Sequence, residues 1–278
     1  MSILSIQSAV AYGHVGNAVA VPALQALGCE AWRVDTVSFS NHPGHGKFTG
    51  DVRPAAEVTD ILRGIESLGV LRTCDAVLSG YLGEPDTAAA VASTVNAARR
   101  ANPDMIYVLD PVIGDDGRVF VRDGVLEAIG DHLLPLANII LPNVSELGWL
   151  SGMAIQDLPS TFQAARLLLD KGPRVVAITG VEEADEMAAY AVTTDATWRS
   201  AAPRRTRNFN GTGDLFAALF TGWSMRSCNP AHALAATVAG LDLVTSETER
   251  LDTRELAIVP VLSSLAETGK TDPATQIS

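Results

Sequence analysis

The chain has 278 residues, 47% hydrophobic and 19% charged, a composition that excludes disordered, collagen-like and low-complexity proteins. Its net charge of −12 disfavours general binding to nucleic acid or to anionic membranes, but leaves room for a local basic pocket. No apolar run reaches the ~18 residues of a membrane span, and residues 1–13 lack the features of a signal peptide. Cys29, Cys74 and Cys228 have no metal or disulfide spacing, which predicts a cytoplasmic enzyme.

Short β-rich runs alternate with stretches of helical periodicity along most of the chain. The runs predict strands at residues 3–6, 33–39, 76–79, 106–110, 139–141 and 175–179. The stretches between them predict helices at residues 15–27, 56–67, 87–101, 145–150 and 160–170. This alternation indicates an α/β fold with a central, mostly parallel sheet and helices on both faces.

The last third of the chain has a different pattern. Residues 189–193 and 197–201 predict a hairpin, and three further helices are expected at 214–225, 231–245 and 253–266. Residues 269–278 are polar and contain Pro273, so they predict a frayed end. Without a repeat or a linker, we expect a single domain over residues 1–266 and a flexible tail over 267–278.

Polar residues cluster where the predicted strands end. They are Ser8, Ser40, Asn41, His42, Gly80, Tyr81, Asp110, Asn143, Glu146 and Thr179. For any one of them an ordinary polar loop is the better explanation. Because ligands bind at the carboxyl ends of parallel strands, six such ends together favour one shared active-site rim.

Gly211, Thr212, Gly213 and Asp214 open a predicted helix. Two glycines there let several backbone N–H groups point at one spot, where the helix dipole stabilises a phosphate or a developing oxyanion. Asp214 in the first turn could accept a proton from a substrate hydroxyl. The alternative is an ordinary glycine-rich turn in which Asp214 interacts only with its own helix terminus.

Several common motifs are missing from the chain. There is no GxxxxGK[ST] loop, no GxGxxG after the first strand, no HExxH and no GxSxG. An ATP site would therefore have to be built in another way. His42 and His45 share a glycine-rich loop, where contact with a ligand is more plausible than a standing metal site.

Carboxylates and an amide meet at two neighbouring strand ends. Asp110 and Asp115 follow one strand, and Asn143 and Glu146 follow the next. Such oxygens suit Mg²⁺ bridged to substrate phosphates. Asn143 and Glu146 also have the spacing of a helix capping box, and both interpretations can hold at once.

The order of these motifs resembles the pyridoxal kinases of the ribokinase-like superfamily, in register from residue 3 to about residue 244. The matching segments are 5–8 (SIQS), 12–17 (YGHVGN), 38–42 (SFSNH), 79–81 (SGY), 110–112 (DPV), 142–143 (PN) and 211–214 (GTGD). The resemblance implies a three-layer α/β/α fold and transfer of the γ-phosphate of ATP to the 5′-hydroxyl of pyridoxal, and often of pyridoxine and pyridoxamine. It also implies a homodimer.

Roles for individual residues follow from the resemblance. Asp214 would be the general base, and the amides of Gly211, Thr212 and Gly213 the anion hole. Ser8 would bond the pyridine ring. The positions expected near the vitamin are Ser8, His42, Pro43, Tyr81 and Asp214.

The resemblance implies a second set of positions for the nucleotide and its cations. The expected ATP-binding residues are Asp110, Leu141, Asn143, Glu146, Thr179, Arg207, Asn208, Phe209, Asn210, Gly211 and Gly213. Asp115 and Glu146 would hold Mg²⁺ through water, and Thr179 lies where relatives place a monovalent cation such as K⁺.

Two positions depart from the family pattern. Pro43 replaces a threonine and offers neither a hydroxyl nor a backbone N–H. Leu141 stands where some relatives carry threonine, which weakens the case for a K⁺ site. Two alternatives stay open: another kinase of the superfamily, acting on a hydroxymethylpyrimidine or a sugar, and a vitamin-binding protein without catalysis. The intact residues 211–214 argue against the latter.

Residues 40–50 form a glycine-rich loop with two histidines and Phe48. Such loops often close over active sites to exclude water. We expect a mobile lid in which Phe48 packs on the closed cleft and His42 approaches the substrate. The alternative is a solvent-exposed turn that joins a strand to the next helix.

Overall fold

The computed structural model describes residues 1–278 and is organised around one ten-stranded sheet, in the order β12-β11-β10-β9-β8-β5-β4-β1-β2-β3. Strands β2, β1, β4, β5, β8 and β9 run parallel, and the outer strands pair antiparallel. The strands are β1 (Ser2–Tyr12), β2 (Glu30–Asn41), β3 (Gly50–Val52), β4 (Ala76–Ser79), β5 (Ile106–Leu109), β8 (Ile139–Ile140), β9 (Val175–Glu183), β10 (Glu186–Val192), β11 (Thr197–Pro203) and β12 (Thr275–Gln276). A separate hairpin joins β6 (Gly114–Asp115) to β7 (Arg118–Val119).

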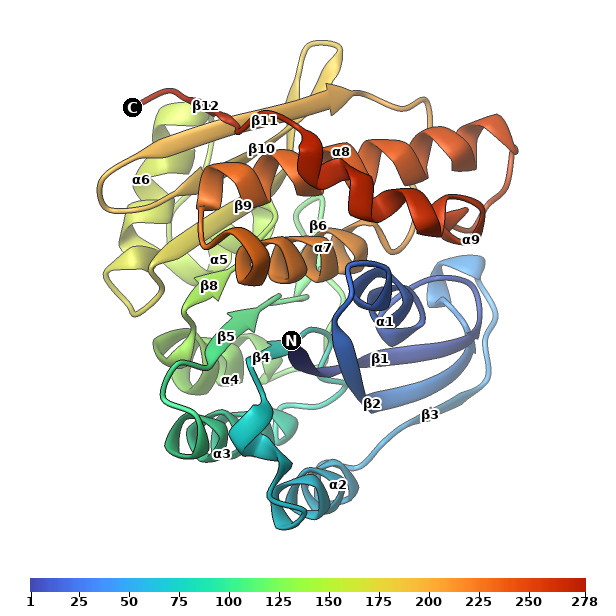
Figure 1. Ribbon diagram of the computed structural model, residues 1–278, viewed down its shortest axis with the longest axis vertical. Helices are drawn as coiled ribbons and strands as arrows, with labels where there is room; N and C mark the ends of the chain where they lie inside the picture. Colours follow the sequence, from blue (N-terminus) through green and yellow to red (C-terminus); the bar gives the residue numbers. More distant parts are fainter.

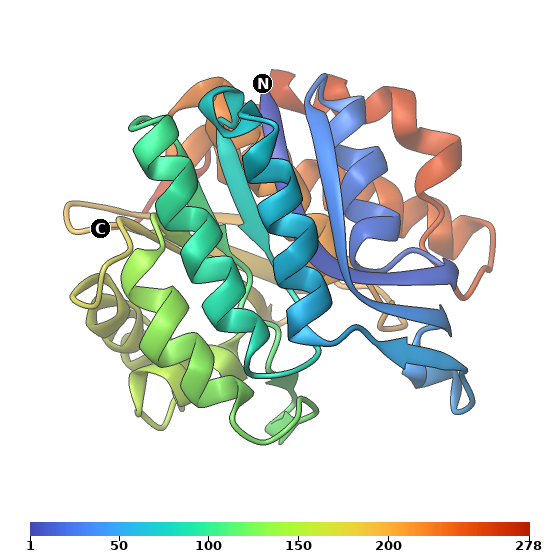
Figure 2. The same ribbon diagram turned by 90° about the horizontal axis from the view of Figure 1, so that it is seen from below.

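Helices cover both faces of the sheet, over two separate clusters of buried apolar side chains. One face carries α1 (Asn17–Ala26), α7 (Thr212–Ser227), α8 (Pro230–Arg250), α9 (Ile258–Val261) and the 3-10 helix η5 (Leu262–Lys270). The other carries α2 (Ala55–Ser67), α3 (Thr87–Ala101), α4 (Val125–Ala128), α5 (Val144–Ser151) and α6 (Leu158–Leu169). Figure 2 shows α2 and α3 side by side on one side of the sheet, with the orange and red C-terminal helices beyond it. The predicted three-layer α/β/α fold is confirmed (Figure 1).

Local sequence signals set several helix starts. Asn143 and Glu146 form a capping box at α5, and Asp157 and Ser160 form another at α6. At α8, the side chain of Asn229 accepts a hydrogen bond from Ala231 N at 2.9 Å, next to a proline in the first turn. These signals explain why most of the predicted helices are confirmed to within a few residues.

The first two strands are longer than predicted, and three short strands were not expected. Strand β1 continues to Tyr12, so Ser8 lies inside the strand, at a register shift between Gln7 and Ala9, and not after its end. Strands β3, β6 and β7 have only two or three residues each, too few for a periodic signal in the sequence.

The C-terminal predictions are partly wrong. A helix over 253–266 would hold Pro260 in its interior; instead α9 begins at Ile258 and Pro260 lies in its first turn. The predicted flexible tail forms β12, which pairs with Trp198 and Arg199 of β11 and continues with a bond from Ile277 N to Thr197 O at 2.9 Å. Figure 1 shows the C-terminus beside β11.

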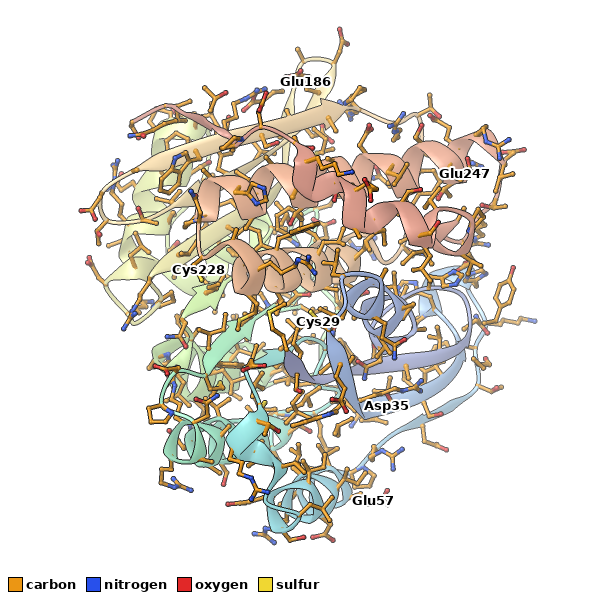
Figure 3. The ribbon with its side chains drawn as sticks, in the orientation of Figure 1. Cys29, Asp35, Glu57, Glu186, Cys228 and Glu247 are labelled. Carbon is orange, nitrogen blue, oxygen red and sulfur yellow. The ribbon has the colours of Figure 1, made fainter.

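The strand order reverses beside β1, because β2 lies on one side of it and β4, β5, β8 and β9 follow on the other. In open α/β sheets, ligands bind outside the carboxyl ends of the strands at such a point. None of the helices is both long and apolar enough to span a lipid bilayer. All three cysteines are free, with Cys29 and Cys228 labelled in Figure 3.

Candidate active site

Two cavities meet at the N-terminus of α7. The first, of about 500 Å³, lies over the carboxyl ends of the parallel strands, and the second, of about 690 Å³, lies between β10–β11 and helices α7 and α8. Their walls share Asp115, Asn143, Thr179, Phe209, Asn210, Thr212 and Gly213. A ligand in one cavity can therefore touch a ligand in the other at the start of α7.

Every residue to which the resemblance gave a catalytic, vitamin, ATP or metal role lines one of these cavities, whereas Ser40, Asn41 and Gly80, also expected at the rim, line neither. The first contains Ser8, His42, Pro43, Tyr81, Asp110, Asp115, Leu141, Asn143, Glu146, Thr179, Phe209, Asn210, Gly211, Thr212, Gly213 and Asp214. Arg207 and Asn208 line only the second. The structure thus brings together residues that lie up to about 200 positions apart in the chain.

The start of α7 is fitted closely against the loop between β1 and α1. Gly211 has φ +89°, and a Cβ there would lie 2.1 Å from the carbonyl oxygen of His14, so only glycine fits. The nearby backbone N–H of Gly16 lowers the pKa of Asp214, but burial has the larger effect and raises that pKa to about 6. The carboxyl of Asp214 therefore titrates near neutral pH.

The same loop is fitted against Ser8. A Cβ on Gly16, which has φ +53°, would lie 2.3 Å from Ser8 Oγ. Below it, Asn17 anchors α1 by donating to Val34 O at 3.0 Å and accepting from Ser5 Oγ at 2.7 Å. Gln7 Nε2 donates to Ser5 Oγ at 2.9 Å. Ser5 and Gln7 belong to the SIQS motif, and Asn17 belongs to YGHVGN. Their buried hydrogen bonds join the start of α1 to β1, the strand that carries Ser8.

Asp110 and Glu146 are buried carboxyls on the wall of the first cavity. Asp110 Oδ2 has no hydrogen-bond partner, and burial together with the charges of Glu146 and Asp214 raises the Asp110 pKa well above its usual value. Burial also raises the pKa of Glu146, to about 7, although three backbone N–H groups bond its carboxylate. The charges of two other carboxyls thus act on Asp110, and no lysine or arginine lines this cavity.

His42 and Tyr81 also line the first cavity. The Nδ1 atom of His42 accepts a hydrogen bond from Gly44 N at 3.1 Å, so the neutral ring carries its proton on Nε2. Burial lowers the pKa of His42 and raises that of Tyr81, which keeps both side chains uncharged at neutral pH.

The second cavity has an apolar end and an arginine-rich mouth. The apolar wall comprises Met187, Ala188, Ala189, Phe216, Val238 and Leu241, a shape and polarity suited to a flat base. At the mouth, Arg205 pairs with Asp242, and Arg207 pairs with Asp252 at 3.1 Å. The apolar wall was not predicted from the sequence, because alanine and valine at helix and strand positions look like ordinary core.

Three further residues of the first cavity were not predicted as site residues: Val37, Phe39 and Phe120. Phe120 follows the unexpected β6–β7 hairpin, and Phe39 lies in β2. Phe48 packs against Phe39, with ring centroids 4.8 Å apart, and does not line the cavity in this structure. Its packing on a closed cleft therefore stays a prediction. Mobility of the loop stays a prediction.

The oxygens in the first cavity suit a hydrated divalent cation. Asp110 Oδ2 is a buried acceptor without a partner, the kind of atom that a cation or its water would satisfy. No group of three or more His, Cys, Asp or Glu side chains is placed to hold a metal directly. The fit is therefore to an ion held mainly by phosphate and water oxygens.

Comparison with known proteins agrees with this geometry. Residues 57–248 match the family described as phosphomethylpyrimidine kinase. Over 271 residues the chain is 40% identical to pyridoxal kinase PdxY of Rubrobacter xylanophilus, covering 95% of this chain and 93% of that protein. It is 43% identical over 269 residues to pyridoxal kinase PdxY of Deinococcus radiodurans, covering 93% and 90%.

A solved structure extends the likeness to the whole fold. Pyridoxal kinase from Leishmania donovani, in complex with ADP and pyridoxamine, superposes with a TM-score of 0.93 at 29% identity, covering 100% of this chain and 99% of that one. The chain therefore belongs to the pyridoxal kinase family.

Proposed function

We propose that this chain transfers the γ-phosphate of ATP to the 5′-hydroxyl of pyridoxal, with pyridoxine and pyridoxamine as further acceptors. The observation that carries the proposal is the meeting of the two cavities at the start of α7, where Asp214 lies. The first cavity, which Ser8, His42 and Tyr81 line, suits a hydroxylated pyridine, and the apolar residues of the second suit adenine.

Asp214 takes the proton from the 5′-hydroxyl. A carboxyl with a pKa of about 6 is mostly ionised at pH 7 and is a better proton acceptor than an exposed aspartate. The backbone N–H of Gly16, which lies against Ser8, favours the ionised form of this carboxyl. The hydroxyl oxygen attacks the γ-phosphorus as its proton moves to Asp214, while the bond from that phosphorus to the β,γ-bridging oxygen breaks and ADP leaves.

The backbone N–H groups of Gly211, Thr212 and Gly213 stabilise the negative charge of the transferred phosphoryl group. They open a helix of 16 residues, so the positive end of its dipole lies at the same place. Because these groups are fixed before the substrate binds, they need little rearrangement during the reaction.

The vitamin is oriented by uncharged polar groups. Ser8 Oγ bonds the pyridine ring, and Nε2–H of His42 and the hydroxyl of Tyr81 bond the ring substituents. His42 and Tyr81 are both neutral at pH 7, because burial lowers the pKa of the imidazole and raises that of the phenol. Pro43 completes this wall without a donor.

Asp110, Asp115 and Glu146 would hold a hydrated Mg²⁺, which when bound compensates the charge of the ATP phosphates. The partnerless oxygen of Asp110 supports this assignment. A K⁺ ion would lie near Thr179, where Leu141 contributes no side-chain oxygen.

The family resemblance supports a homodimer, and the three free cysteines are in keeping with a cytoplasmic protein. Light scattering on the purified chain tests the homodimer. We expect twice the monomer mass, and the mass of a monomer would contradict the proposal.

The experiment is ATP-dependent formation of pyridoxal phosphate, followed by absorbance with pyridoxal as acceptor. Pyridoxine, pyridoxamine, a hydroxymethylpyrimidine and ribose form the comparison panel, since the matched family model is that of phosphomethylpyrimidine kinases. The proposal expects the B6 vitamers to have the highest kcat/KM. A higher value for the pyrimidine would favour that kinase activity instead. Vitamer binding without turnover would indicate a vitamin-binding protein.

A further inference from the structure

The carboxylate of Glu255 lies between two loops that border the candidate active site. Its Oε1 is 2.6 Å from Nε2 of His45, in the loop between β2 and β3, and its Oε2 accepts from the backbone N–H of His14 at 3.3 Å. Both side chains of the pair are largely shielded, with 11% of Glu255 and 17% of His45 exposed. Shielding makes such a contact stronger than an ion pair on the open surface.

The chain is shaped to admit this carboxylate. Gly13 has φ +103°, and a Cβ at that position would lie 2.0 Å from Glu255 Oε2. Any other residue would push the carboxylate away from the loop between β1 and α1. Gly13, the first glycine of the YGHVGN motif, is thus needed for the approach of Glu255 as well as for the turn.

Arg254 makes a second tie to the same loop, because its Nη2 donates to the carbonyl oxygen of Gly44 at 2.7 Å. Gly44 lines the first cavity together with His42 and Pro43. Two consecutive residues of the segment between α8 and α9 therefore hold the loop that forms the vitamin-facing wall.

The other loop leads to the proposed base. The carbonyl of His14 abuts Gly211, and the backbone N–H of Gly16 lies near enough to Asp214 to lower its pKa. Glu255 itself lines neither cavity, so it does not touch a substrate. It contacts one loop on the vitamin side and one on the side of the base.

We propose that Glu255 is a positioning residue, which holds residues 42–46 in the conformation that binds pyridoxal. The proposal rests on the function proposed above. It predicts that loss of the carboxylate charge weakens pyridoxal binding while leaving the phosphoryl-transfer step and ATP binding in place.

The kinetic test is Glu255→Gln, which keeps the size of the side chain. We expect KM for pyridoxal to rise about tenfold, the scale of a lost charge-assisted hydrogen bond, with kcat and KM for ATP changed less than twofold. Glu247→Gln is the matched control, since Glu247 on α8 (Figure 3) pairs with Arg250 at 2.6 Å and is 17% exposed. An unchanged KM for pyridoxal, or a fall confined to kcat, would overturn the proposal.

His45→Gln approaches the same contact from the other side. In a double-mutant cycle the two substitutions should be strongly non-additive, with KM in the double variant close to that of Glu255→Gln alone. Independent, additive effects on KM would mean that Glu255 does not act through His45 and would contradict the proposal.

A proteolysis test does not depend on the enzymatic function. Lysine occurs only at positions 47, 171 and 270, so a lysine-specific protease can cut at three places, of which the exposed Lys47 lies in the tethered loop. Cleavage after Lys47 should be several-fold faster in Glu255→Gln than in the wild type or Glu247→Gln, while cleavage at the other two lysines serves as internal reference.

The two tests separate the two proposals. A wild-type chain inactive on pyridoxal would contradict the proposed function, while faster cleavage at Lys47 in Glu255→Gln would still support the hold on the loop. Equal cleavage at Lys47 in all variants would overturn the role of Glu255, whatever the activity.

Discussion

Glu146 holds the backbone of Ile113 in place: its Oε1 accepts the N–H of Ile113 at 2.8 Å, while its Oε2 accepts the N–H of Asn143 at 3.0 Å. One buried carboxylate thus joins the segment after β5 to the start of α5. The prediction of a capping box from the sequence is confirmed, but the longer-range bond to Ile113 could not be expected from the spacing of these residues.

Glu146→Gln should lower the free energy of unfolding by about 1–3 kcal/mol, because the amide has one acceptor oxygen and its NH₂ would face a backbone donor. In the assay, the Mg²⁺ concentration for half-maximal rate should rise more than KM for pyridoxal does. Denaturant titration and Mg²⁺ titration measure the two effects. A shift in KM for pyridoxal with an unchanged Mg²⁺ requirement would show that the metal assignment of Glu146 is wrong.

Asp110→Asn should make the protein more stable and less active. The folded state raises the pKa of Asp110, so the folded chain binds its proton more tightly than the unfolded chain does, and stability is lost as pH rises above the unfolded value of ~4. Asparagine removes that cost. We expect Tm to rise by about 2–4 °C at pH 8 and by less at pH 5, in thermal melts at both values.

The exposed Asp104 provides the control for this experiment, since Asp104→Asn should leave Tm within a degree of the wild type at both pH values. A lower Tm for Asp110→Asn at pH 8 would mean that its ionised carboxylate stabilises the fold, contrary to the burial argument.

Pro43→Thr should lower KM for pyridoxal with little change in KM for ATP. Pro43 lines the first cavity at the start of a short 3-10 turn, and threonine there would add a hydroxyl and a backbone N–H. Steady-state kinetics with each substrate varied in turn measures the effect. Proline also restricts the conformations of the unfolded loop, so its loss offsets part of the gain in pyridoxal binding. An equal or higher KM for pyridoxal would show that the missing donors are unimportant.

The fold was largely predictable because its central part depends on local signals. Helix α3 has the predicted bounds, and α5 and α6 begin at recognisable capping residues. The strand-end residues converge as expected because parallel strands place their carboxyl ends on one edge of the sheet.

The missed features depend on contacts between distant segments. The strand formed by Thr275–Gln276 exists because Trp198 and Arg199 offer a free edge, and Gly50–Val52 forms a strand only against β2. Likewise, the segment around Glu255 is held in a non-helical course by contacts with Gly13, His45 and the Thr248 hydroxyl, to which Ala257 N donates at 2.8 Å. No periodicity within these segments reports such partners.

The pH dependence of kcat/KM for pyridoxal should show the titration of the base. Burial raises the pKa of Asp214 to about 6, and the group must be deprotonated to accept the hydroxyl proton. The value of kcat/KM should therefore rise with pH through about 6 and level off above pH 7. A profile that stays flat between pH 5 and 7 would mean that no such group controls the reaction of the free enzyme.

The most direct test of the account is the turnover of Asp214→Asn with ATP and pyridoxal, measured beside nucleotide binding by calorimetry. If Asp214 is the general base, kcat falls by about 10²–10⁴, the acid limb of the pH profile disappears, and the Kd for ATP stays within about twofold of the wild type. Turnover close to that of the wild type, with the same dependence on pH, would contradict the assignment of Asp214 and with it the proposed mechanism.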